Sequence, residues 1–266
     1  MKLKMIALAA MLAAGSANAA IDNGSGGNGE LFMTVWDSVG QQSYTLDLNL
    51  TMNDFLTGVA AGTSYSYAAD ANMSSFLSLV APANQSGLLF AIGAMDASGA
   101  TATDTHRYIT TASVIDLGVT VTNNNLKQLG STGATFLGNT NGLIGAGDSL
   151  VVTDPSIIAY AGSAQWGSNW GTKFNGVSTG LVGGDLGLYF LRQTTGASGF
   201  GPTAPQNQPS IYEALAFNGN QYMASLDMNG NLTIAAAPVP EAETYAMMLA
   251  GLGLVGFMVA RRRRAA

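Results

Sequence analysis

The sequence predicts a mainly β protein whose body is a single antiparallel β-sandwich, jelly-roll-like in its connections. Three observations favour this fold. Apolar and polar residues alternate along several short segments, which is the pattern of strands with one buried face. Glycine, with 34 residues among 266, separates these segments together with other turn-forming residues. No internal repeat of fixed period occurs, so the many short strands indicate a sandwich and not a solenoid.

The predicted strands follow one another at short intervals. In chain order they are residues 30–36, 43–50, 115–121, 186–190, 221–227 and 231–235. The first two form a hairpin through Asp37-Ser38-Val39-Gly40. The last two form a second hairpin through Met228-Asn229-Gly230, because Asn and Gly both tolerate the positive φ of tight turns.

Helix signals are few. Asn53-Asp54 is expected to cap a short turn. Apolar residues at helical spacing predict one helix over residues 72–80. The glycine-rich segments 133–147 and 198–208 are expected to be loops.

The N-terminus has the pattern of a signal peptide over residues 1–19. Lys2 and Lys4 precede an apolar stretch that is too short for a stable anchor. The small residues Ala17 and Ala19 then form a signal-peptidase site, with cleavage expected after Ala19. Signal peptidase is therefore an expected partner, and the body is expected to be exported.

The C-terminus combines a short polar motif, an apolar span and a basic cluster. The motif is Val239-Pro240-Glu241, and the span covers residues 244–260 without a charge. As a transmembrane helix this span would rise about 25 Å, near the lower limit for crossing a bilayer. The basic cluster, which the positive-inside rule keeps in the cytoplasm, is Arg261, Arg262, Arg263 and Arg264. The body at 20–234 and a Pro/Ala spacer at 235–240 would then lie outside the inner membrane.

Together these features resemble the PEP-CTERM proteins, which are exported proteins of Gram-negative bacteria that make exopolysaccharide. The similarity covers residues 239–266 and is carried by Pro240, Glu241, the span and the arginines. It implies that an exosortase processes the tail after transient anchoring in the inner membrane. It also implies a final location at the cell surface or in the medium. Activity does not follow from the resemblance, because the bodies of these proteins vary widely.

Composition excludes several functional classes. Between residues 21 and 240, four basic and fourteen acidic residues leave a net charge of −10, so the body is not expected to bind nucleic acid. The absence of cysteine excludes thiolate catalysis and thiolate zinc sites. The one histidine, His106, has no G-x-S-x-G motif to accompany it. A G-x-G-x-x-G pattern at 251–256 lies inside the apolar span, so no nucleotide cofactor is expected.

Candidate sites in the body are few. Paired Asp and Glu carboxylates are the remaining route to a glycosidase, although many aspartates stand at expected turns. Residues 227–231 and 22–30 loosely resemble calcium loops, but the first lacks its twelfth-position glutamate because Pro238 stands there, and turns are the simpler interpretation. Trp166 and Trp170 lie four residues apart among polar neighbours and are a possible glycan contact. The alternative is that both tryptophans are buried.

These observations favour a non-enzymatic, exported protein. We expect a structural or glycan-associated component of the exopolysaccharide matrix, acting in biofilm or floc formation. Extracellular polysaccharide is then a possible partner beside exosortase and signal peptidase. Two alternatives stay open, namely a secreted carbohydrate-active enzyme that uses Asp/Glu pairs and a glycan-binding module.

Overall fold

The computed structural model describes residues 20–96, 107–113, 121–145, 147–167, 178–192 and 210–237. The strands are β1 (Glu30–Asp37), β2 (Gln42–Thr51), β3 (Tyr65–Tyr67), β4 (Leu89–Asp96), β5 (Arg107–Ala112), β6 (Ser149–Val152), β7 (Gly180–Leu181), β8 (Asp185–Arg192), β9 (Ile211–Ala214), β10 (Ala216–Phe217), β11 (Asn220–Leu226) and β12 (Leu232–Ala236). The helical elements are α1 (Met52–Ala61), α2 (Ala71–Leu79), α3 (Asn123–Ile144) and the short 3₁₀ turn η1 (Gln85–Gly87). The described part of the chain is therefore mainly β, as predicted.

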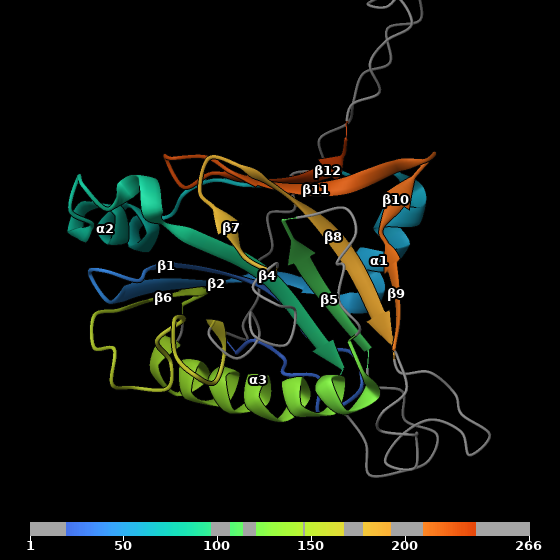
Figure 1. Ribbon diagram of the computed structural model, residues 1–266, viewed down its shortest axis with the longest axis horizontal. Helices are drawn as coiled ribbons and strands as arrows, with labels where there is room; N and C mark the ends of the chain where they lie inside the picture. Colours follow the sequence, from blue (N-terminus) through green and yellow to red (C-terminus); the bar gives the residue numbers. More distant parts are fainter. Residues whose placement is uncertain are drawn as a thin grey trace, which may run out of the picture. The chain divides into compact units, whose positions relative to one another are not determined.

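The described strands join one antiparallel sheet that curls into a half-barrel (Figure 1). The path of the sheet is β3-β12-β11-β8-β5-β4-β1-β2-β6, and β10, β7 and β9 pair with β11, β4 and β8. The predicted sandwich is not confirmed, because a sandwich has two separate sheets packed face to face, whereas strand pairing here is continuous from β3 to β6. Alternation along a strand reports which side chains are buried, but it does not report where a sheet is interrupted.

The inner face of the curled sheet holds the larger hydrophobic core. Strands near both ends of the path contribute to it, for example Leu48 of β2 and Ile234 of β12. Phe55 of α1 and Phe76 of α2 are fully buried in the same core. These two helices therefore cover part of the inner face and insert apolar side chains into its core.

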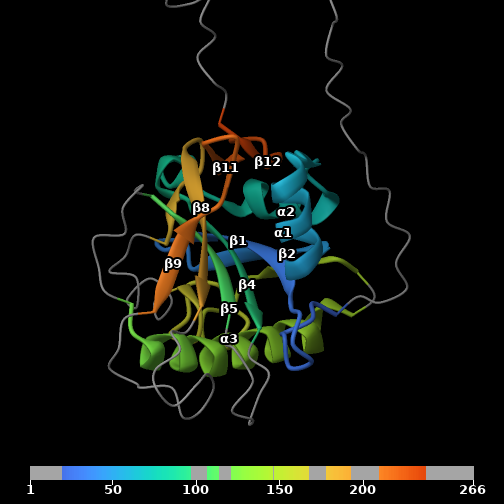
Figure 2. The ribbon, with the colours of Figure 1, turned by 90° about the vertical axis from the view of Figure 1, so that its right-hand side faces the viewer.

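The outer face is covered by α3, which Figure 2 shows apart from α1 and α2. The prediction of a loop over 133–147 is wrong, because the helix continues to Ile144. Thr122 caps it by accepting a hydrogen bond from the backbone N–H of Asn125 at 3.2 Å. The apolar side chains that the helix buries include Leu126, Leu129, Phe136 and Leu137, which follow helical spacing and join the outer core. Packing of this stripe overrides the poor helix propensity of the interspersed glycines.

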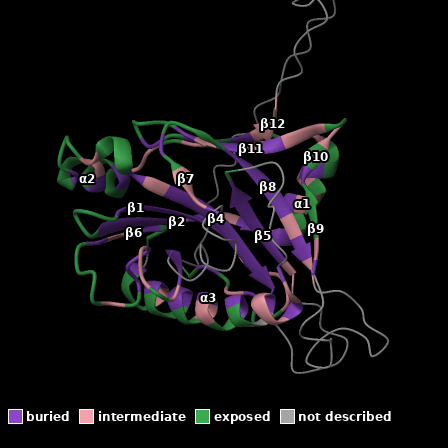
Figure 3. Cartoon of the chain, in the orientation of Figure 1, coloured by how far each residue is buried: buried purple, intermediate pink, exposed green. Residues whose placement is uncertain are grey.

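Coverage on both faces removes the alternation expected of the central strands (Figure 3). Residues 31–37 of β1 are all buried. In β8, the strand predicted at 186–190, the neighbours Leu188 and Tyr189 are both buried although they point to opposite faces. The strand prediction is confirmed there, and the expectation of a single buried face is wrong.

Both predicted hairpins are confirmed, β1 with β2 and β11 with β12. In the second turn Gly230 alone takes a positive φ, 86°, so Asn229 does not need the left-handed conformation. The Asn53 cap is wrong: α1 begins at Met52, and the hydroxyl of Thr51 accepts from the backbone N–H of Asp54. The helix predicted at 72–80 is confirmed as α2.

Several predictions fall outside the described residues. These are the signal peptide at 1–19, His106, the strand at 115–121 except Val121, the loop at 198–208 and the tail from Val239 onward. Among the described helices, none combines the length and the apolar character needed to traverse a bilayer.

Candidate functional site

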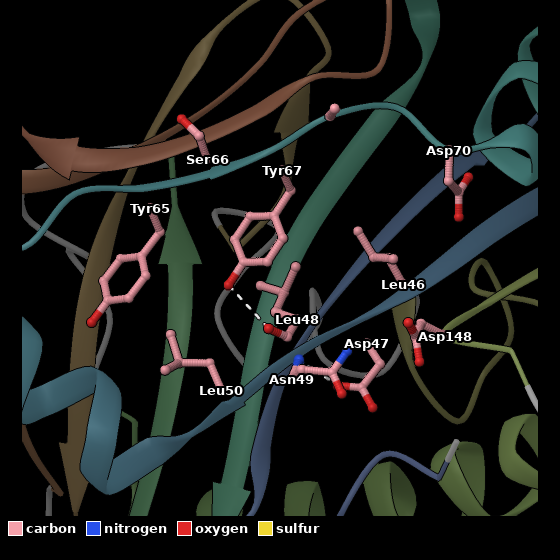
Figure 4. A pocket seen from close by; sticks show the side chains of 11 residues that line it. Leu46, Asp47, Leu48, Asn49, Leu50, Tyr65, Ser66, Tyr67, Asp70 and Asp148 are labelled. Atoms are coloured by element: carbon pink, nitrogen blue, oxygen red, sulfur yellow. Dashed lines mark hydrogen bonds between the residues drawn. The ribbon is translucent and has the colours of Figure 1, made fainter. Parts of the chain in front are cut away.

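The described part of the chain contains a pocket where the two ends of the curled sheet approach each other. β3 begins the strand path and β2 lies near its other end, and no β3–β2 pairing joins the two. A side-chain bond spans the gap instead, because the hydroxyl of Tyr67 donates to the backbone carbonyl of Leu48 at 3.0 Å (Figure 4). We call this space the seam pocket. Its volume is about 320 Å³, and its lining residues are Leu46, Asp47, Leu48, Asn49, Leu50, Tyr65, Ser66, Tyr67, Ala68, Asp70 and Asp148.

A bulge in β2 shapes one wall of the seam pocket. Glu30 pairs with Thr51 but Phe32 pairs with Asp47, so three residues of β2 lie opposite one residue of β1. Asn49, within the bulge, has a φ of 50°, a conformation that Asn tolerates better than most residues. Its backbone N–H donates to Oδ1 of Asp47 at 2.8 Å. The bulge thus holds the Asp47 carboxyl by one oxygen.

The second oxygen of Asp47 has no hydrogen-bond partner among the described residues. Only 2% of Asp47 is exposed. Burial raises the pKa of Asp47 to about 7, the Asn49 N–H opposes this rise, and the carboxylates of Glu30 and Asp148 add to it. Asp47 is therefore a buried carboxyl group that exchanges its proton near neutral pH.

A polar network closes the seam beside the pocket. Asp70, which caps α2, accepts from the backbone N–H of Met73 at 2.6 Å and from the hydroxyl of Ser149 at 2.5 Å. The side-chain amide of Asn72 donates to the Ser149 hydroxyl at 2.9 Å. Burial, followed by the charge of Asp70, raises the pKa of Tyr44, so its hydroxyl stays protonated. These bonds tie α2 to β6 across the opening of the half-barrel.

The seam pocket combines hydrogen-bond acceptors with apolar surface. Asp47, Asp70 and Asp148 supply carboxyl groups, while Tyr65 and Tyr67 supply ring faces. Among the described residues that line the pocket, none is a lysine or an arginine. Such a pocket favours a hydroxylated ligand without negative charge. Within the described ranges, no three His, Asp or Glu side chains are grouped so that they could hold a metal ion.

The structure places Trp166 in the outer core, so its prediction as a glycan contact is wrong. The side chain is fully buried, and its ring lies 4.7 Å from Phe32 and 5.7 Å from Phe136, measured between centroids. Its indole N–H donates to the hydroxyl of Thr34 at 2.9 Å. Buried aromatic rings with a satisfied N–H serve packing. Trp170 lies outside the described residues.

The two segments that resembled calcium loops form hydrogen-bonded turns. Oδ1 of Asp227 accepts from the backbone N–H groups of Asn229 and Asn231 at 2.9 and 2.8 Å. In the other segment Asp22 accepts from the N–H of Gly24, and Glu30 accepts from that of Asp22, both at 2.8 Å. The carboxylates thus hold the local backbone, which explains their positions.

Sequence reasoning missed the seam pocket. Asp47 was visible only as the polar member of an alternating strand, and Tyr65 and Tyr67 stood in a segment that had no predicted strand. An aspartate two residues before an asparagine within a strand was the available signal. The pocket also needs β3, which lies at the other end of the sheet path.

The comparisons with known proteins concern the tail. Residues 238–264 match the family model of the PEP-CTERM protein-sorting motif. This match confirms the resemblance carried by Pro240, Glu241, the apolar span and the arginines. No curated protein and no solved structure matches the chain.

Proposed function

We propose that this protein is a structural or glycan-associated component of the exopolysaccharide matrix and acts in biofilm or floc formation. The chain carries the PEP-CTERM motif, which marks an exported protein for exosortase processing. The motif match is the observation that carries this proposal. The motif also implies membrane anchoring before the exosortase acts. The mature form then resides at the cell surface or in the medium.

The composition of the body supports a structural role. It contains no cysteine, and the chain has a single histidine, so a thiolate nucleophile is excluded and His106 is the one imidazole available as a general base. The structure stabilises the body by packing on both faces of the sheet instead of by disulfides. We therefore propose that the body is not an enzyme.

One observation favours the carbohydrate-active alternative. The pKa of about 7 at Asp47 suits a general acid, and Asp148 lines the same pocket. If the purified protein releases reducing ends from the host polymer and the Asp47→Asn variant does not, the carbohydrate-active alternative replaces the structural role.

The proposal is tested in the host by comparing the full chain with a chain that lacks residues 238–266. An epitope in the β1–β2 turn at Val39, whose side chain is exposed, reports location without disturbing the core. We expect the full chain in the matrix fraction, and the truncated chain released into the medium or periplasm. A deletion strain whose biofilm and flocs keep unchanged mass and cohesion would overturn the matrix role.

A further inference from the structure

Asn-Gly pairs recur along the chain, and such pairs can rearrange without an enzyme. The pairs are Asn23-Gly24, Asn28-Gly29, Asn141-Gly142, Asn175-Gly176, Asn218-Gly219 and Asn229-Gly230. Asparagine is a thermolabile residue, and glycine, which has no Cβ, lets its backbone nitrogen approach the side-chain amide carbon of the asparagine before it. Asn175-Gly176 lies outside the described residues, and the structure distinguishes the other five pairs.

In two of the described pairs the N–H of the glycine is hydrogen-bonded. That of Gly24 donates to Oδ1 of Asp22 at 2.8 Å. That of Gly230 donates to the backbone carbonyl of Asp227 at 3.0 Å. The nitrogen that would have to attack is therefore held in another direction.

In two more of the described pairs the side chain of the asparagine is hydrogen-bonded. Oδ1 of Asn28 accepts from the backbone N–H of Asn53 at 2.9 Å. The side-chain amide of Asn141 accepts from the backbone N–H of Ile21 at 3.0 Å and donates to its carbonyl at 2.9 Å. The amide carbon that would be attacked is therefore fixed by its own partners.

Asn218-Gly219, the turn between β10 and β11, has neither restraint within the described part of the chain. Phe217 pairs with Asn220, so the turn has two residues, and their φ values are 51° and 81°. Both residues are exposed. No described group accepts from the Gly219 N–H or bonds to the Asn218 side chain. A Cβ on Gly219 would have no heavy atom within 4 Å.

The turn can also open locally. The backbone must rotate at Asn218 before the Gly219 nitrogen can face the side-chain amide carbon. β10 is two residues long and, among the described strands, pairs with β11 alone. So short a strand at an edge opens at a low cost in free energy compared with the core strands.

We propose that Asn218 is a site of spontaneous deamidation and isoaspartate formation. The backbone nitrogen of Gly219 loses its proton and bonds to Cγ of Asn218, while the bond from Cγ to the side-chain nitrogen breaks and that nitrogen leaves with the proton as ammonia. Water then adds to either carbonyl carbon of the resulting succinimide and opens the ring to aspartate or isoaspartate. The net change consumes one water, releases one ammonia and adds one negative charge to the body.

The isoaspartate product alters the hairpin because it inserts one extra carbon into the backbone of the turn. A two-residue turn joins its strands only with a narrow set of dihedral angles, so the longer backbone unpairs β10 from β11. Phe217, next to the turn, packs its ring against Gly62, the C-cap of α1 (Figure 1). Modification at Asn218 therefore loosens the contact between β10 and the end of α1.

The test incubates mature protein purified from the host near pH 8, where the attacking nitrogen loses its proton more readily than in acid. Peptide mass spectrometry measures deamidation at every pair, and electron-transfer fragmentation identifies isoaspartate. We expect Asn218 to deamidate about tenfold faster than the asparagine of any other described pair, because each of those must first break a hydrogen bond. Asn218→Gly, which tolerates positive φ, should abolish the early release of ammonia, and Asn229→Gly, the same change in a hydrogen-bonded turn, should leave it unchanged.

Three outcomes would overturn the inference. One is that Asn218 stays intact, or that another described pair reacts as fast in the folded protein. Another is that Asn218 still leads about tenfold in protein unfolded in urea, since its neighbours in sequence and not the open turn would then set the rate. The third is wild-type amide hydrogen-exchange protection of β10 and the end of α1 in the isolated isoaspartate form, because the modification would then leave the hairpin intact.

Discussion

The buried carboxyl group of Asp47 predicts that the stability of the fold decreases as pH rises towards neutrality. The pKa of Asp47 rises from an ordinary value of 3.8 to about 7 in the folded protein. Between these values the folded state keeps the proton and the unfolded state has lost it, so the contribution of Asp47 is fully present below about 3.8 and is lost by about 7. At about 1.4 kcal/mol per pKa unit, a difference of about three units gives an upper limit of about 4 kcal/mol.

The variant Asp47→Asn removes this titration and keeps an oxygen to accept from the Asn49 N–H. Urea unfolding of both proteins near pH 5 and near pH 8 measures the free energy of unfolding. Between pH 5 and pH 8 we expect the free energy of unfolding of the wild type to fall by about 3 kcal/mol relative to that of the variant. The reason is that about two pH units, from pH 5 to the folded pKa of about 7, separate the folded and unfolded proton affinities in this interval. The comparison cancels the titration of other carboxylates.

The control is Asp154→Asn. Asp154 is exposed, and the hydroxyl and backbone N–H of Ser156 lower its pKa, so its contribution is lost as pH falls and not as pH rises. This variant should match the wild type between pH 5 and pH 8. If Asp47→Asn also keeps the wild-type pH dependence, Asp47 is already ionised or solvated in the fold and the reasoning fails.

Three further predictions concern the core and its support. Trp166→Phe removes the hydrogen bond from the indole N–H to Thr34 and should lower the free energy of unfolding in urea by about 1–3 kcal/mol. Recovery of the protein with matrix polymer should stay unchanged. Loss of that recovery in a folded variant would contradict a purely structural role for Trp166. Gly93→Ala would bring a Cβ within 2.4 Å of the Trp166 ring and should cost about 1–3 kcal/mol in the same assay. The cost of Gly93→Ala should be smaller when Trp166 is already replaced by Phe. If the two substitutions instead lower the free energy of unfolding additively, the strain does not come from the contact between the new Cβ and the Trp166 ring. Arg107→Gln leaves the nearly buried Asp96 without its 2.8 Å ion pair. We expect the free energy of unfolding in urea near neutral pH to fall by about 1–3 kcal/mol. An unchanged midpoint of unfolding would show that solvent already screens this ion pair.

The parts of the fold that could be predicted depend on neighbours in the sequence. The β1–β2 and β11–β12 hairpins and the helix α2 are set by turns, caps and periodicity within a few residues. The helix α3 could not be predicted, because its glycines lower local helix propensity. Its apolar stripe is stabilised only by packing against β4, β6 and the rings of Phe32 and Trp166.

The candidate site illustrates the same limit at single residues. Trp166 looked exposed because its neighbours in sequence are glycine and polar residues, yet Phe32 and Phe136 enclose it. Asp47 looked like the solvent-facing member of an alternating strand, yet the bulge at Asn49 and the return of β3 bury it.

The sequence by itself determined that this protein carries a sorting motif, because the motif is one contiguous segment. It consists of a short polar signal, an apolar span without charge and four arginines, and its recognition needs no contact with distant residues. Only the tertiary structure decided that the strands form one curled sheet and that β2 and β3 face each other without pairing. A pocket forms there because the two ends of the curled sheet approach each other without pairing. Where this happens follows from the twist of the whole sheet and from the helices that cover its faces, and not from any single strand.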